Sequence, residues 1–112
     1  MTTLLITHPS FVEHDTGLGH PERPDRMRAI DKALAHDTFK GLKRQEAPLR
    51  DDVEAAIELA HPRSYIDWVK SQRPAEGAEP VRLDPDTVLS ARSWEPALRA
   101  VGAGLLAVDR VM

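Results

Sequence analysis

The most informative stretch of the sequence is a loop that leads into a helix. The stretch reads Gly17-Leu18-Gly19-His20-Pro21-Glu22-Arg23-Pro24-Asp25-Arg26. Two prolines restrict the path of the main chain through this loop. Pro24 suits the first position of a helix, because its φ is already helical and its missing N–H would be unpaired there anyway. Asp25 follows in the first turn, where a negative charge is favoured. The stretch therefore predicts an ordered loop delivered into a helix, with Arg26 on the first helical turn.

The helix that begins here carries apolar residues at a helical period. Met27, Ile30 and Leu34 stand at i, i+3 and i+7, which predicts an amphipathic helix of about three turns. We expect Gly41 to close it. Upstream, the short apolar run Leu4-Leu5-Ile6 predicts a buried strand. The residues between them, 8 to 23, have no period and predict a long loop, and loops of this length are often functional.

Further strands and helices are predicted along the rest of the chain. Residues 42–48 predict a second, edge-like strand, and Asp51 or Asp52 is expected to cap a short helix that ends at His61-Pro62. A further helix runs through Tyr65 to Val69, and residues 74–80 form a polar linker before an Asp-rich turn at residues 84–87. Several helices alternate with two or three strands, which indicates an α/β fold.

The last helix is expected to start at Ser93 or a nearby residue and to continue to Met112 without a stop signal. One face is apolar, and the opposite face is made of small residues that would allow another backbone to approach closely. Because no sheet would cover Leu98, Val101 and Leu105, we expect marginal stability and self-association through residues 93–112. We interpret residues 1–112 as the N-terminal portion of a single domain that is incomplete within this sequence.

Composition excludes several classes of protein. The 112 residues carry a formal net charge of −3, which argues against a direct nucleic-acid partner, since such proteins concentrate Lys and Arg. There is no cysteine, which excludes disulfides and thiol chemistry and fits a reducing cytoplasm. The apolar run at the N-terminus is too short for a signal peptide or a membrane span, so we expect a cytoplasmic protein with no membrane partner.

Three histidines recur at six-residue intervals in the loop, namely His8, His14 and His20. Two interpretations remain open: a small zinc site, and a polar loop stabilised by side-chain hydrogen bonds. The spacing is no known compact zinc signature, which favours the second interpretation. The chain has no nucleophile elbow and no phosphate-binding loop, so serine-hydrolase and nucleotide-binding functions lack support.

Four segments, in order, resemble the histone deacetylase and acetylpolyamine amidohydrolase family, especially its class II-like bacterial members. They are Gly17-x-Gly19-His20-Pro21-Glu22-Arg23-Pro24-x-Arg26, then His61-Pro62-x-Ser64-Tyr65-Ile66-Asp67, then Asp84-x-Asp86-Thr87-x-x-Ser90, and lastly Ser93-Trp94-Glu95-x-Ala97-Leu98-Arg99-Ala100-Val101-Gly102-Ala103. The resemblance spans the whole chain and covers roughly the first third of a family catalytic domain. It implies the three-layer arginase/deacetylase fold, with a central parallel sheet flanked by helices.

The resemblance also implies roles for particular residues. His20 and Pro21 match the loop that walls the mouth of the substrate tunnel, and Asp86, or less directly Asp84, falls where the family often holds the substrate backbone. Arg26 matches an arginine that lines an internal channel. The family's zinc ligands, paired histidines and oxyanion tyrosine have no match here, because the sequence contains no His-His pair and no Asp-x-His.

We therefore expect the N-terminal segment of a zinc-dependent deacetylase that hydrolyses acyl-amide bonds on acetyl-lysine or acetylpolyamine, with the segment alone inactive and binding no zinc. The alternative is a non-catalytic interaction module that keeps the deacetylase-like scaffold and binds a partner through its last helix.

Overall fold

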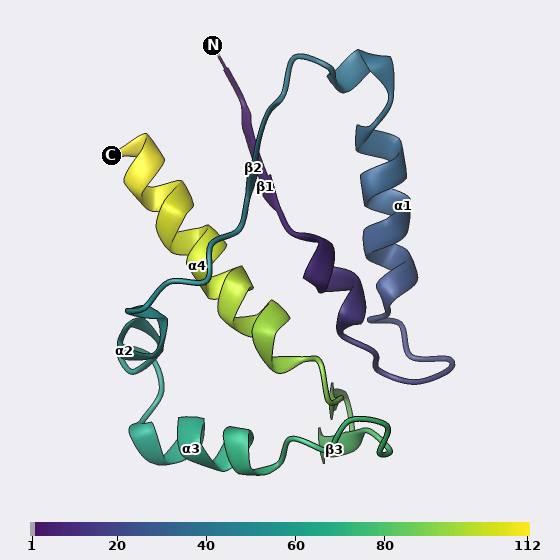
Figure 1. The fold of residues 1–112 in the computed structure, drawn as a ribbon, viewed down its shortest axis with the longest axis vertical. Helices are drawn as coiled ribbons and strands as arrows, with labels where there is room; N and C mark the ends of the chain where they lie inside the picture. Colours follow the sequence, from purple (N-terminus) through teal and green to yellow (C-terminus); the bar gives the residue numbers. More distant parts are fainter. Residues whose placement is uncertain (1) are drawn as a thin grey trace.

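The computed structural model describes residues 2–112 and begins with a strand–helix–strand unit (Figure 1). Strand β1 (Leu4–Thr7) is followed by helix α1 (Pro24–Leu34) and strand β2 (Lys43–Glu46). The two strands pair in parallel, with Leu4 opposite Lys43 and Thr7 opposite Glu46. A parallel pair needs a long crossover connection, which α1 and its flanking loops supply. The expected strands and the mixed α/β character are confirmed, but β1 is only partly buried because β2 is its one neighbouring strand in the described residues. The three-layer arrangement of the whole family domain stays a prediction.

The segment between β1 and α1 is more ordered than the sequence indicated. A 3-10 helix, η1 (Pro9–Glu13), occupies the first part of the predicted loop. Pro9 stands in its first turn, and the ring of His8 accepts the main-chain N–H of Ser10 at 3.0 Å. The prediction of an unbroken loop from residue 8 to residue 23 is therefore wrong for residues 9–13. The five-residue turn escaped notice because it is too short to show a hydrophobic period.

Helix α1 starts at Pro24, as predicted, but ends earlier than expected. Its last residue is Leu34, and a 3-10 turn, η2 (Asp37–Phe39), follows before Gly41. The main-chain N–H of Ala35 donates to the carbonyl of Asp31, and Ala35 itself stays right-handed. The helix end is thus closed without a left-handed residue, so Gly41 is not its cap. No residue of α1 is buried within the described part of the chain.

Two short helices connect β2 to the second half of the chain. They are α2 (Val53–Ile57) and α3 (Arg63–Ser71). Asp52 does occupy the residue before α2, but its side chain does not cap the helix and instead binds Arg50 at 2.9 Å. The helix is accordingly shorter than predicted. Ile66 is the buried residue of α3, and Figure 1 shows this helix at the end of the molecule opposite the N-terminus.

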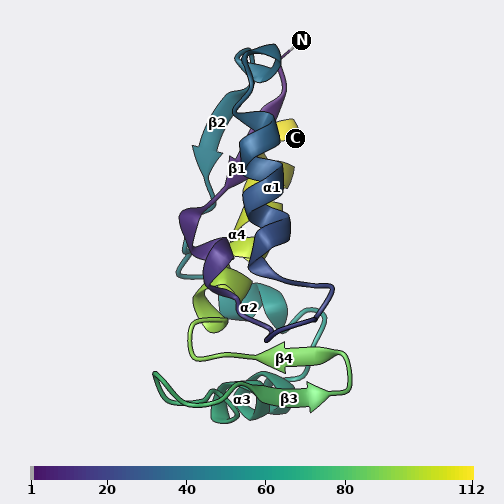
Figure 2. The same ribbon diagram turned by 90° about the vertical axis from the view of Figure 1, so that its right-hand side faces the viewer.

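A hairpin follows the polar linker and was not anticipated as such. Strands β3 (Val81–Asp84) and β4 (Thr87–Leu89) pair antiparallel, with an irregularity in register between Arg82 and Asp84 (Figure 2). The predicted Asp-rich turn is present at its tip, where the Asp84 carboxylate accepts the N–H of Asp86 at 2.8 Å and the hydroxyl of Thr87 at 2.9 Å. An Asp side chain that bonds to the main chain two residues later stabilises a local reversal of the chain.

The longest element is α4 (Trp94–Val111), which Figure 1 shows running through the middle of the molecule. It contacts η1, β1 and α2, and its buried Gly102 lies against the loop at Pro48. The apolar core is small, and its buried members in the described residues are Ala47, Val53, Ile66, Val88 and Leu89. The C-terminal turns of α4 are open, since Val108 is 58% exposed and Met112 is 95% exposed. None of the described helices is long and apolar enough to span a membrane.

Candidate functional site

The main pocket lies between the loop at residues 14–22 and the segment that runs from β3 into α4. Its volume is about 600 Å³. Most of its wall is apolar, including Phe11, Met27, Leu83, Val88, Leu89 and Pro96. Its polar side chains come from both walls, and they include His14, Thr16, His20, Glu22, Asp86 and Ser93. An apolar pocket with a few convergent polar groups is the usual form of a small-molecule site. In Figure 2 the loop that precedes α1 lies next to β4.

His20 joins the two walls of the main pocket. Its Nε2 is 3.1 Å from the main-chain oxygen of Asp86, and its Nδ1 accepts the N–H of Glu22 at 3.1 Å. Because Nδ1 acts as an acceptor, the ring proton must be on Nε2, which then donates to the Asp86 carbonyl. Both ring nitrogens are used, so the His20 ring is held in place in the wall. The structure therefore brings His20 and Asp86 together, and their role at a tunnel rim stays a prediction.

The two candidate rim carboxylates have different environments. Asp84 is engaged by the turn itself, and the N–H of Asp86, followed by the hydroxyl of Thr87, holds the pKa of the Asp84 carboxyl below its usual range. The side chain of Asp86 makes no hydrogen bond within residues 2–112, lines the main pocket and is exposed. Asp84 organises the turn, while Asp86 is the carboxylate available to a ligand.

The remaining predicted site residues lie near the pocket edge. Pro21 is exposed between His20 and Glu22. Arg26 is on the first turn of α1, as predicted, with its side chain 51% exposed and paired with Glu22. Glu22 lines the main pocket and Arg26 does not. The predicted place of Arg26 in an internal channel stays a prediction.

A buried hydrogen-bonded group at the start of α4 was missed by the sequence analysis. Nδ1 of His14 lies 2.6 Å from Oγ of Ser93, and Ser93 in turn contacts Ser90. Ser90 also accepts the N–H of Asp15 at 3.2 Å. Two serines three residues apart at a helix start are a signal for local capping, and nothing local indicates that their partner is a histidine 79 residues away.

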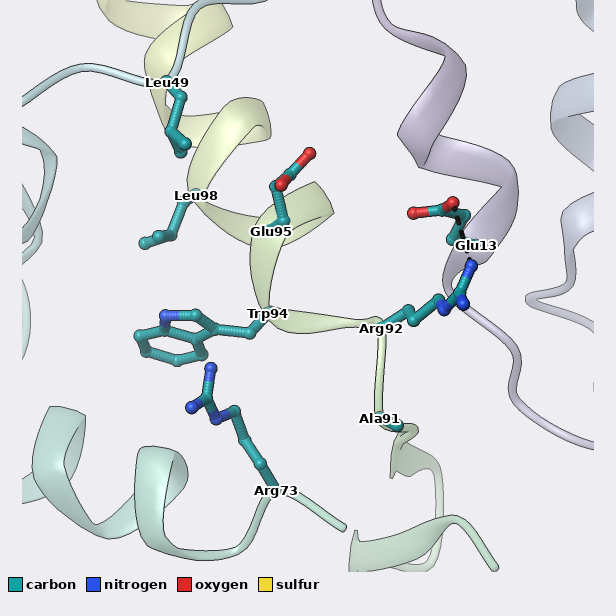
Figure 3. Close-up of a pocket in the computed structure, with 8 residues that line it drawn as sticks. All are labelled: Glu13, Leu49, Arg73, Ala91, Arg92, Trp94, Glu95 and Leu98. Atoms are coloured by element: carbon teal, nitrogen blue, oxygen red, sulfur yellow. Dashed lines mark ion pairs between the residues drawn. The ribbon is translucent and has the colours of Figure 1, made fainter. Parts of the chain in front are cut away.

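A second pocket, the Trp94 pocket, lies beside the first turn of α4 and has a volume of about 460 Å³ (Figure 3). The guanidinium of Arg73 lies 5.9 Å from the centre of the Trp94 ring, and the ammonium of Lys70 lies 5.8 Å from it. Arg92 pairs with Glu13 at 3.5 Å on the far side of the pocket. These contacts tie α3 and η1 to the start of α4, which supports the wall of the main pocket.

The loop histidines do not gather into a metal site. His8 bonds to Ser10, His14 to Ser93, and His20 to Asp86. Across residues 2–112, no three side chains of the ligating types converge as a group that could hold a metal ion. The structure therefore favours the interpretation of a polar loop stabilised by side-chain hydrogen bonds.

Comparison with known proteins gives two results. A sequence model described as the histone deacetylase domain matches residues 20–112. A protein of Synechocystis sp. (strain PCC 6803), itself described as uncharacterized, is 30% identical to the chain over 110 residues, which is 96% of the chain. The chain spans only 35% of the length of that relative.

Proposed function

Because the chain belongs to the histone deacetylase family, we propose that residues 1–112 are the N-terminal portion of a deacetylase catalytic domain and build one wall of its substrate site. Family membership indicates a hydrolase in the parent family. The proposed domain has the three-layer fold of the family, with a central parallel sheet flanked by helices. The length of the Synechocystis relative supports the view that the catalytic domain includes further residues.

The observation that carries the proposal is the pairing of two distant loops at the main pocket. The segment that resembles the family's tunnel-mouth loop contributes His20, and the segment that resembles its rim contributes Asp86. They are joined directly although they lie 66 positions apart in the sequence. An exposed carboxylate beside an apolar cavity suits a substrate that presents amide N–H groups at the entrance and a methylene chain inside.

The proposed reaction is hydrolysis of an acyl amide on acetyl-lysine or acetylpolyamine. In the complete domain zinc would polarise the amide carbonyl and activate water. We propose that its ligands come from outside residues 1–112, because the zinc-binding motifs of the family have no match in this sequence. In this proposal the chain contributes binding and orientation through His20, Pro21 and Asp86, and it is inactive alone.

The test is a zinc-dependent deacetylase assay with a fluorogenic acetyl-lysine substrate, run on this chain and on the longest product of its gene. We expect activity in the longer product and none in residues 1–112. Silence in both would refute the proposal, and activity in the short chain would show that the chemistry lies elsewhere than proposed.

A variant pair sharpens this assay. His20→Ala removes a wall-joining residue, and we expect kcat/KM of the longer product to fall about tenfold, which is about 1.4 kcal/mol of transition-state stabilisation. His36→Ala is the matched control, because the His36 ring accepts the N–H of Thr38 at 3.1 Å in the same way but does not line the main pocket. Equal effects of the two substitutions would count against a site at His20.

A further inference from the structure

The buried group at the start of α4 consists of His14, Ser90 and Ser93. Ser93 is 3% exposed and Ser90 is 8% exposed. Oγ of Ser93 lies 2.6 Å from Nδ1 of His14 and 2.8 Å from Oγ of Ser90, and it accepts the N–H of Ser90 at 2.9 Å. The N–H of Asp15 reaches Oγ of Ser90 at 3.2 Å. Each hydroxyl has one proton and two acceptor positions, so the direction of every bond can be worked out.

One arrangement of protons satisfies the whole group. Ser90 donates its hydroxyl proton to Ser93, whose two acceptor positions are then filled by the N–H and O–H of Ser90. Ser93 must therefore donate its own proton to Nδ1 of His14. In the reverse arrangement His14 would donate to Ser93 and Ser93 to Ser90, which would leave the proton of the buried Ser90 hydroxyl without an acceptor. Leaving a buried donor unpaired is unfavourable by about 1–3 kcal/mol, which disfavours the reverse arrangement.

This proton count fixes the state of the His14 ring. With Nδ1 as an acceptor, a neutral imidazole carries its proton on Nε2. The hydrogen bonds of residues 2–112 include no partner for Nε2 of His14, and no unpartnered side-chain nitrogen in that range is buried. Nε2 is consequently accessible, and His14 lines the main pocket. An accessible N–H donor is thus held on an otherwise largely apolar wall.

We infer that His14 is a ligand-binding residue of the main pocket, which donates its Nε2–H to a carbonyl or carboxylate oxygen of an acyl ligand while Ser93 and Ser90 hold its proton on that nitrogen. Nothing in the family resemblance or the sequence comparison assigns His14 a role. The identity of the ligand as an acyl group rests on the proposed function, whereas the donor state of the ring rests on the serine group alone.

The experiment is NMR of the chain with ¹⁵N-labelled histidine rings. We expect the His14 ring to be the Nε2–H tautomer, with the signal assigned by its loss in His14→Leu. Titration with sodium acetate should then shift Nε2 of His14, whereas methylammonium chloride, a cationic donor of similar size, should not. His14→Leu should weaken acetate binding about tenfold as measured on the Val88 and Leu89 amides, and His36→Leu should leave it unchanged.

Ser93→Ala provides a second check and should make the ring exchange between tautomers. If Ser93→Ala unfolds the chain, Ser90→Ala tests the same hydrogen-bonded group at the serine that lies farther from His14. An Nδ1–H tautomer in the unmodified chain, or a His14 ring that ignores acetate, would overturn the inference. Because these measurements need no catalysis, an inactive longer product would refute the proposed function and leave the assignment of His14 standing.

Discussion

Gly102→Ala is the substitution whose outcome the structure specifies most directly. Gly102 is buried where α4 crosses the loop at Pro48, and an added Cβ would overlap the main-chain oxygen of Pro48 and lie 3.4 Å from its carbonyl carbon. A main-chain carbonyl cannot move aside as a flexible side chain does, so the helix and loop must separate. Such overpacking destabilises by about 1–3 kcal/mol. Against this stands a gain of about 1 kcal/mol in helix propensity from replacing glycine.

Gly104→Ala supplies the matched comparison in the same helix. Nothing lies within 4 Å of a Cβ added at Gly104, so this variant should gain the propensity alone. Since the propensity gain is shared, Gly102→Ala should have a free energy of unfolding about 1–3 kcal/mol below that of Gly104→Ala. Urea unfolding followed by far-ultraviolet circular dichroism measures both. If Gly102→Ala proves as stable as Gly104→Ala, the close approach of α4 to Pro48 is refuted.

Three further predictions concern single residues. Thr16 is 6% exposed, and its hydroxyl donates to the main-chain oxygen of Glu22. Thr16→Val should therefore lower the free energy of unfolding by about 1 kcal/mol, as measured by urea denaturation. An unchanged midpoint of unfolding would contradict this hydrogen bond. The pKa of Asp84 is lowered from 3.8 by the turn, so its stabilisation is complete above pH 3.8 and is lost as pH falls through the lower folded value. Asp84→Ala should remove that part of the acid dependence of unfolding, and two superimposable acid profiles would count against it. Val108 is 58% exposed on α4, so we expect the chain to self-associate through this surface. Val108→Asp should make the chain monomeric in sedimentation velocity. A monomeric unmodified chain would exclude self-association through this surface.

Local rules were enough to predict the elements whose ends are determined by neighbouring residues. Pro24 predicted the first residue of α1 because its ring fixes φ and lacks an N–H, and the structure confirms it. The same kind of rule failed at Gly41, since the chain left α1 through a 3-10 turn that pairs the last carbonyls without glycine. At Asp52 the capping rule failed because Arg50 competes for the same carboxylate.

The candidate site depended on contacts that local patterns do not contain. The resemblance to the deacetylase family placed His20 and Asp86 at one rim, and the structure joins them through the main chain of Asp86. The sequence also predicted that Ser93 or a nearby residue starts the last helix, which is confirmed, but it gave no sign that the Ser93 hydroxyl binds His14. Such long-range pairing has no periodic signal, because it depends on how loops meet after the helices have packed.

The bonds that assemble the main pocket join residues 66, 75 and 79 positions apart. Closing a loop of about 75 residues opposes folding by about 4 kcal/mol of chain entropy plus a constant, and no contact at the pocket offsets it until the ends meet. Helices α1 and α4 can form earlier from local contacts, so the pocket is expected to assemble late in folding. Substitutions among its bridging residues should then speed unfolding rather than slow folding. On the ribosome, the loop at residues 14–22 could not form its bonds to Asp86, Ser90 and Ser93 until more than half of this sequence had emerged.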